Sequence, residues 1–361
     1  MKKFGIIIML IVLTCVGLGA NLGAIAFADE NTELTVLKTN NLGISSIKVS
    51  NIQCFLKKQE KQKKSAESIA NEIYKALSYT SEDIDKLSLQ ELLYILEVES
   101  VEIQNYIIEV NAETGEQNLR ESAPQELLNK AEITKSMIET NGSNDIIVNP
   151  GGSETDIKSN DWMQITSVFY QDSRYNKTRE EEVERIDKDG NPYTTIVEVI
   201  ERYGYKCDFT FKWLSNPLWR SVEELGIAWS DGDGIYISGS DWNVYRNKGS
   251  VSYDYSFSAG MEIREGTYFE ELPFEINGIY GRSLTWNLPT NLSGIYFYGF
   301  TYNLGVILEV SRDFNMIASY AHRTFGMGGL GISIGPASIS FSAASKSVFS
   351  TGAYLIDVPT I

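Results

Sequence analysis

The sequence predicts an α+β fold with segregated elements: a small helical N-terminal region followed by a mainly antiparallel, β-sandwich-like C-terminal domain. Apolar residues recur at helical spacing between positions 65 and 98, whereas from Asp161 onward they recur at every second position. Residues 141–160, rich in Gly, Ser, Asn and Asp, separate the two patterns and are typical of a linker. We therefore expect a leader over 1–28, a polar and helical region over 29–140, a linker over 141–160 and a β-rich domain over 161–361.

The composition is that of a folded, acidic protein. Of the 361 residues, 43% are hydrophobic and 22% are charged, and the formal net charge is −17. This acidity argues against nucleic acid as a main partner, because binding to phosphates needs a basic surface. His322 is the single histidine in the chain. Classical triads and His-rich metal sites are therefore disfavoured.

The first residues have the pattern of a cleavable signal peptide. Lys2 and Lys3 precede an apolar run over 4–18, and the sequence Ala26-Phe27-Ala28 supplies the small residues expected before a cut at Asp29. Glycines and an asparagine after the run argue against an uncleaved anchor. The sequence thus predicts a secreted, extracellular protein.

The cysteines leave two alternatives open. Cys15 belongs to the predicted leader, so Cys54 and Cys207 remain in the mature chain. Outside the cell they could form one disulfide, but two buried thiols are the favoured interpretation.

The helical region carries start signals of its own. Ser88 and Glu91 have the spacing of a capping box. Thr80 and Ser81 both offer an N-cap to a short turn, with Asp83 placed for a capping interaction. Just before these helices, residues 57–64 contain five lysines, a basic island in an acidic protein. We interpret it as a solvated helix or tether, with contact to anionic wall polymer or lipid headgroups as the alternative.

The second half of the chain shows strands and turns. The segment Asp187–Asn191 lies between two extended runs and predicts a hairpin. Amphipathic helices do not occur between the later extended runs, which argues against a parallel sheet. The expected fold of this half is therefore antiparallel.

Three segments carry a resemblance. The segment Tyr79–Leu87, the Trp-Leu-x-x-Pro-x-x-Arg-like element Phe211–Arg220 with Glu223 and Glu224, and the sequence Tyr320-Ala321-His322 before a Gly/Ser-rich tail are its basis. Together they resemble uncharacterised secreted proteins of Gram-positive bacteria. The resemblance implies export and a β-rich C-terminal domain, and it implies no known activity. From the residues alone, we expect a strand that ends at Pro217, and Arg220 pairing with Glu223 or Glu224.

Acidic clusters suggest chemistry only weakly. Glu180, Glu182 and Glu184 would share one face of a strand, which could hold calcium or an acid–base pair, but a solvated strand face is the simpler interpretation. The Asp-rich segments at Asp187 and Asp231 resemble the start of a calcium loop but lack its final glutamate, so ordinary turns are expected. His322 has no neighbouring carboxylate in the sequence. We therefore assign no catalytic, cofactor-binding or metal residue and expect no cofactor.

The C-terminal stretch Gly326–Gly352 alternates apolar residues with Gly and Ser. This pattern describes a half-buried sandwich hairpin, our preferred interpretation, and also a pore-lining β-hairpin.

Three functions remain open. The favoured one is a secreted, non-enzymatic protein that binds at the cell surface or to an extracellular ligand, because reactive residues are few and aromatic residues are abundant. The second is a β-pore-forming or membrane-active protein using the hairpin within Gly326–Gly352. The third is a secreted hydrolase with a carboxylate site not evident in the sequence. Candidate binding tryptophans are Trp162, Trp219, Trp242 and Trp286. The ligand, the partners beyond a possible wall or membrane contact, and the oligomeric state are not predicted.

Overall fold

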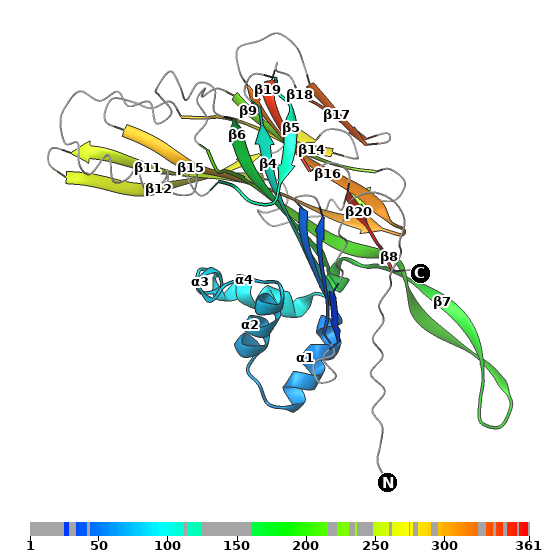
Figure 1. Cartoon of the computed structure of the whole chain (residues 1–361). Coiled ribbons are helices and arrows are strands. Elements are labelled where there is room, and N and C mark those ends of the chain that lie inside the picture. The colour runs from blue at the N-terminus through cyan, green and yellow to red at the C-terminus, as the bar shows by residue number, and fades with distance from the viewer. Residues whose placement is uncertain are drawn as a thin grey trace.

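Two antiparallel β-sheets pack face to face, and a small group of helices covers part of the outer face of the larger sheet (Figure 1). The computed structural model describes residues 25–28, 34–41, 44–111, 114–124, 160–215, 222–230, 235–236, 248–259, 262–273, 275–276, 281–289, 295–323, 330–334, 337–341, 345–351 and 354–359. All the strand pairs of these residues are antiparallel, as the sequence predicts for the second half of the chain. Among the described residues, no helix is both long and apolar enough to cross a bilayer.

The large sheet runs through the whole molecule. Its main path is β1 (Ile25–Ala28), β2 (Thr35–Asn41), β3 (Ile44–Ser50), β4 (Ser100–Val110), β6 (Asp161–Gln171), β8 (Pro192–Trp213), β15 (Ile295–Val310), β11 (Lys248–Ala259) and β12 (Glu262–Pro273). Three short or protruding strands join this path at its sides: β5 (Gln117–Arg120) on β4, β7 (Lys177–Ile186) on β8 and β10 (Ile235–Tyr236) on β15.

The second sheet covers the inner face of the large one. It contains β13 (Glu275–Ile276), β14 (Gly281–Asn287), β9 (Val222–Trp229), β16 (Phe314–Arg323) and β19 (Ser345–Ser350), with β20 (Tyr354–Ile356) also on β16. The core between the sheets includes Phe209, Phe211, Tyr302, Tyr320 and Phe349, all nearly or fully buried. Alternation places these residues on one face of their strands, so burial of that face is the main force that joins the sheets.

The helices form between β3 and β4. They are α1 (Ile52–Lys61), α2 (Ala66–Ala76), α3 (Ser81–Asp85), α4 (Leu89–Tyr94) and the 3₁₀ turn η1 (Ile95–Glu97). Both expected capping boxes are present and confirm the predicted starts: Thr80 caps α3 with Asp83, and Ser88 caps α4 with Glu91.

The predicted segregation of a helical N-terminal region from a β domain is wrong. The chain is β-rich on both sides of the helices, and β4, which follows them, pairs with β3 before and β6 after. The apolar stripe of the helices, including Ile69 and Ile73, packs onto Val49 and Ile103 of β3 and β4. Short helices are not stable alone and must bury their apolar stripe against another surface. Here the large sheet provides that surface, so the helices and the strands share one structure. The predicted linker over 141–160 falls outside the described residues except for Asn160.

One hairpin leaves the sheets altogether. β7 and the first half of β8 form a two-stranded ribbon that projects into solvent, away from both sheets (Figure 1). The predicted turn at Asp187–Asn191 closes it: Asp187 Oδ1 accepts hydrogen bonds from the backbone N–H groups of Asp189 and Asn191 at 2.8 Å, and Gly190 adopts a φ of 85°. The ordinary turn expected there is thereby confirmed.

Candidate binding site

A row of hydroxyl and amide side chains crosses the outer face of the large sheet. Its members lie directly opposite one another on adjacent strands, in the order Asn40, Ser45, Asn105, Thr166, Thr210, Asn303 and Ser250. We call these residues the polar row. Each is exposed or half-buried, because the second sheet covers only the opposite face.

Hydrogen bonds along the polar row fix the orientation of its side chains. Thr166 Oγ1 donates to Asn105 Oδ1 at 2.7 Å, and Thr210 Oγ1 donates to Asn303 Oδ1 at the same distance. Asn303 Nδ2 in turn donates to Ser250 Oγ at 3.2 Å. These donors and acceptors are already held in place by folding. A ligand that binds them would therefore cause a smaller loss of side-chain conformational entropy.

The helices turn one end of this row into a cleft. The cleft has a volume of about 790 Å³, within the range of ligand sites, and lies between the sheet and the α2–α3 connection. Most of the residues that line it have polar side chains, although apolar surface also contributes; the lining residues are Lys38, Thr39, Asn40, Ser45, Ser46, Ile47, Leu77, Ser78, Tyr79, Asp83, Lys86, Ile103, Asn105, Gln164 and Thr166.

Two lysines and a tyrosine line the cleft: Lys38 comes from β2, and Tyr79 and Lys86 come from the helical segment. Lys38 Nζ donates to Ser78 Oγ at 3.0 Å, and Lys86 Nζ pairs with Glu82 at 2.8 Å. The ring of Tyr79 packs edge-on to Tyr74 with 5.1 Å between centroids. Burial, together with the nearby carboxylate of Asp83, raises the pKa of Tyr79, so its hydroxyl stays protonated and able to donate.

The described residues that line the cleft do not include a pair of carboxyl groups. Among the described residues that line the cleft, Asp83 is the one carboxylate, and it caps α3. Hydrogen bonds from the Thr80 side chain and backbone lower the pKa of Asp83, which therefore stays ionised at neutral pH. Glycoside hydrolysis needs two facing carboxyl groups, one of them protonated. The described part of the cleft thus offers hydrogen bonds, positive charge and one aromatic ring rather than an acid–base pair.

His322 lies elsewhere and has a carboxylate partner that is distant in the sequence. It sits on β16 directly opposite Glu223 on β9, with Nδ1 2.8 Å from Glu223 Oε1, and both side chains are buried. Sequence reading missed the pair because 99 positions separate the two residues and only strand pairing brings them together. Arg220, which the sequence predicts to pair with Glu223 or Glu224, lies outside the described residues.

The pair belongs to the core between the sheets. The Trp213 ring packs edge-on against His322, and Trp213 Nε1 donates to Tyr320 Oη at 2.8 Å. Burial opposes a charged imidazole, but the charge and hydrogen bond of Glu223, with Asp161 nearby, outweigh it and raise the pKa of His322. Burial also raises the pKa of Glu223, although His322 opposes this shift. Neither residue lines the cleft.

The acidic residues Glu180, Glu182 and Glu184 share one exposed face of the β7–β8 ribbon, as predicted. Among the described residues, no group of His, Cys, Asp and Glu is arranged to hold a metal ion. Asp231 lies outside the described residues.

The candidate tryptophans and the two cysteines differ in how deeply they are buried. Trp162 lies in the core and Trp286 is half-buried beside Tyr253 and Tyr302, whereas Trp219 and Trp242 fall outside the described residues. Cys54 and Cys207 are unpaired. Cys207 is buried as expected, but Cys54 is exposed on α1, so the interpretation as two buried thiols is wrong for Cys54.

The stretch Gly326–Gly352 contains the expected hairpin. β17 (Leu330–Ile334) and β18 (Ala337–Phe341) pair so that Leu330 is opposite Phe341 and Ile332 is opposite Ile339. The backbone of this hairpin lies beside the second sheet, near β9, β14 and β16.

The polar row itself was not found in the sequence. Its residues lie far apart along the chain, and each is a single polar position in an alternating strand. One signal in the sequence could have indicated a polar face on each strand. Gln164 and Thr166, and likewise Thr210 and Lys212, are polar residues that alternate with buried apolar residues. Strand order, which decides that these positions meet, is not encoded locally.

Comparisons with known proteins give no family. No family model matches the chain, and no curated protein matches it. Among solved structures, the chain is similar to the NetB toxin of Clostridium perfringens in its membrane-inserted form, at 9% identity over 50% of this chain and 96% of that chain, with a TM-score of 0.18. A TM-score this low does not establish a shared fold, so the similarity supports no inference about structure or function.

Proposed function

We propose that this chain is a secreted, non-enzymatic binding protein that recognises a carbohydrate through the cleft at the end of the polar row. One observation carries the proposal: hydroxyl and amide groups from successive strands, Ser45, Asn105 and Thr166, stand in register on the floor of a cleft of about 790 Å³. The signal peptide predicted over 1–28 supports the secreted location.

Carbohydrates suit this lining for a chemical reason. Each sugar hydroxyl both donates and accepts, and amide and hydroxyl side chains offer both roles. Tyr79 adds an aromatic ring and a protonated hydroxyl at the wall, and such an amphipathic side chain can pack against an apolar sugar face while donating a hydrogen bond. Lys38 and Lys86 extend the range to sugars with a carboxylate or phosphate group.

A glycan array with paired variants tests the proposal. The array first identifies a glycan or wall polymer that the unchanged exported chain binds. The variant with both Asn105→Ala and Thr166→Ala is then expected to lose binding to that ligand. The matched control is Thr285→Ala with Asn287→Ala, the same residue types exposed on β14 of the second sheet. Unchanged binding by the cleft variant, or no binding of any glycan or wall polymer by the unchanged protein, would remove the proposal.

Membrane insertion by the β17–β18 hairpin is a second candidate, favoured by the alternation of apolar residues with Gly and Ser in the sequence Gly326–Gly352. To insert, the hairpin would have to leave its place beside β9 and β14. Dye release from neutral and anionic vesicles measures this activity directly. Vesicles that stay sealed at micromolar protein would exclude it.

A further inference from the structure

The β7–β8 ribbon stands apart from the core of the molecule. Both of its strands pair only with each other among the described residues over Thr178–Ile200, and a two-stranded ribbon is marginally stable in water by itself. Most of its residues from Lys177 to Glu198 are exposed. A surface of this kind gains stability when something covers it.

The two faces of the ribbon differ sharply in exposure. On one face, Val183, Val197 and Val199 are half-buried by their neighbours. The other face carries Glu180, Glu182, Glu184 and Glu198, together with Ile186 and Ile196, which are 74% and 63% exposed. We call this second side the acidic face.

Among the described residues, no lysine or arginine forms an ion pair with Glu180, Glu182 or Glu184 of the acidic face. Glu180 lies directly opposite Glu198, and Ile196 lies directly opposite Glu182. Like charges in directly opposed positions destabilise a strand pair. Among the described residues, the ion pairs of the ribbon, Arg179 with Glu181 and Lys177 with Glu201, do not involve Glu180, Glu182 or Glu184. A cation with an apolar stem would satisfy both the glutamates and the exposed isoleucines.

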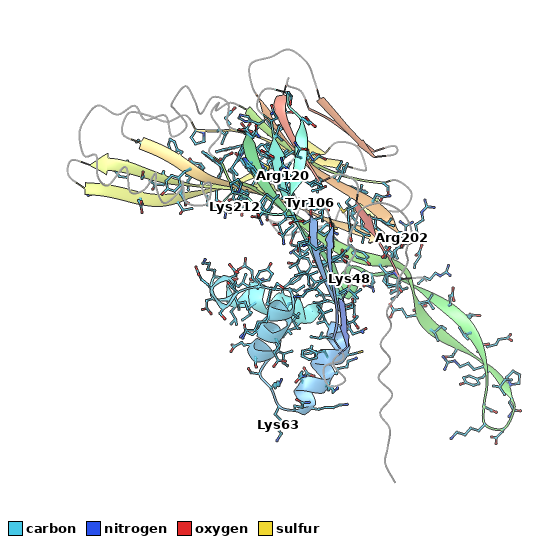
Figure 2. The ribbon with its side chains drawn as sticks, viewed as in Figure 1. Lys48, Lys63, Tyr106, Arg120, Arg202 and Lys212 are labelled. Carbon is cyan, nitrogen blue, oxygen red and sulfur yellow. The ribbon has the colours of Figure 1, made fainter. Side chains whose placement is uncertain are left out.

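Lysines with these properties stand at the far end of the helices. Lys57, Lys61 and Lys63 are exposed and have no ion-pair partner among the described residues, whereas Lys64 pairs with Glu72. Figure 2 shows Lys63 at the tip of the helical group, on the side away from the sheets. We call Lys57, Lys61 and Lys63 the basic tip.

The two surfaces match in spacing as well as in charge. Lys57 and Lys61, four residues apart on a helix, are separated by a rise of about 6 Å. Glu180 and Glu182, alternate residues of a strand, are about 6.6 Å apart. Lysine stems also cover apolar surface while the ammonium group remains at the edge, which suits Ile196. From this complementarity we infer that the acidic face of one copy docks on the basic tip of a second copy of this chain.

The symmetry of this contact has a consequence. The acidic face and the basic tip are different surfaces, so the contact is heterologous. One copy retains an unused basic tip, and the other retains an unused acidic face. Repetition of the contact yields a ring or an open filament, unless two copies satisfy both contacts reciprocally as a dimer.

Charge reversal with mixing tests the inference on the full exported chain. Sedimentation velocity at about 0.1 M salt, where screening beyond about 10 Å limits repulsion between acidic copies, is expected to show species larger than a monomer. The reversals Glu180→Lys with Glu182→Lys, or Lys57→Glu with Lys61→Glu, are each expected to weaken association at least tenfold. Mixing the two variants creates opposite charges at both contacts and is expected to restore association.

The control keeps the change in net charge but moves it elsewhere. Glu116→Lys with Glu121→Lys alters two other exposed glutamates and is expected to leave the association unchanged or stronger. If a reversal prevents folding, Glu180→Gln with Glu182→Gln provides a milder variant that is expected to weaken association. A wild-type protein that stays monomeric, reversals without effect, a mixture that stays dissociated, or association that requires an added metal ion or another protein would each overturn the inference.

Discussion

The two faces of the large sheet are made by the same strands and differ in almost every other respect. On β8, Phe211 is fully buried against the second sheet, while its neighbour Thr210 faces the other way, half-exposed in the polar row. The inner face buries aromatic side chains, and the outer face holds hydroxyls and amides in register. The difference shows that alternate residues of one strand form two different surfaces: one set joins the sheets, and the other set forms the polar row.

The largest expected difference is in stability at adjacent positions of β8. Phe211→Ala should cost about 3–5 kcal/mol of the free energy of unfolding, because it leaves a cavity in a packed aromatic core. Thr210→Ala should cost about 1 kcal/mol or less, since one partly exposed hydrogen bond is lost. Urea unfolding measures both values. Similar costs at the two positions would mean that the faces do not differ as described.

The buried pair of the inner face predicts a characteristic pH dependence. Because the pKa values of His322 and Glu223 are both raised, the folded state binds more protons than the unfolded state at mildly acidic pH. The stabilisation from His322 is fully present below its unfolded pKa of about 6.5 and is lost as pH rises through the higher folded value.

Replacing Glu223 by Gln should reverse this slope. Burial then dominates at His322 and depresses its folded pKa, so its contribution to stability should rise with pH through the region near 6.5 instead of falling. Urea midpoints of both proteins, measured from mildly acidic to mildly alkaline pH, test the change of sign. Parallel profiles would show that the pair does not couple to folding.

A substitution on the outer face should change ligand affinity more than it changes stability. Asn105→Ala removes an amide from the floor of the cleft and should weaken ligand affinity about tenfold, equal to about 1.4 kcal/mol. The melting temperature should change little, because Asn105 is half-buried. Titration calorimetry with the glycan identified on the array gives the affinity. A large loss of stability with no loss of affinity would assign Asn105 to the scaffold.

The smallest effect is expected on the ribbon, which belongs to neither face. Val197→Ala should reduce stability by less than about 1 kcal/mol, because its side chain is already half-exposed. Val251→Ala, the same change at a fully buried position of the inner face, should cost at least twice as much. Equal costs would mean that another part of the protein covers the ribbon in the isolated chain.

Local features were predictable wherever the signal is contained in a few neighbouring residues. The capping boxes at Thr80 and Ser88, the turn at Asp187 and the alternation of β8 were all read correctly, because caps, turns and strand faces depend on short-range geometry. The segregated fold class was wrong because the pairing of β4 with β6 spans the stretch that was taken for a boundary. His322 appeared isolated for the same reason, since its partner Glu223 is distant in sequence.

The sequence by itself determined which residues alternate, which helices begin where, and that the chain is acidic with few reactive groups. Only the tertiary structure decided which strands are neighbours, and with them the polar row, the cleft beneath the helices and the buried Glu223–His322 pair. The physical reason is that side-chain direction has a period set within each strand, whereas strand order is set by the burial of apolar surface summed over the whole molecule.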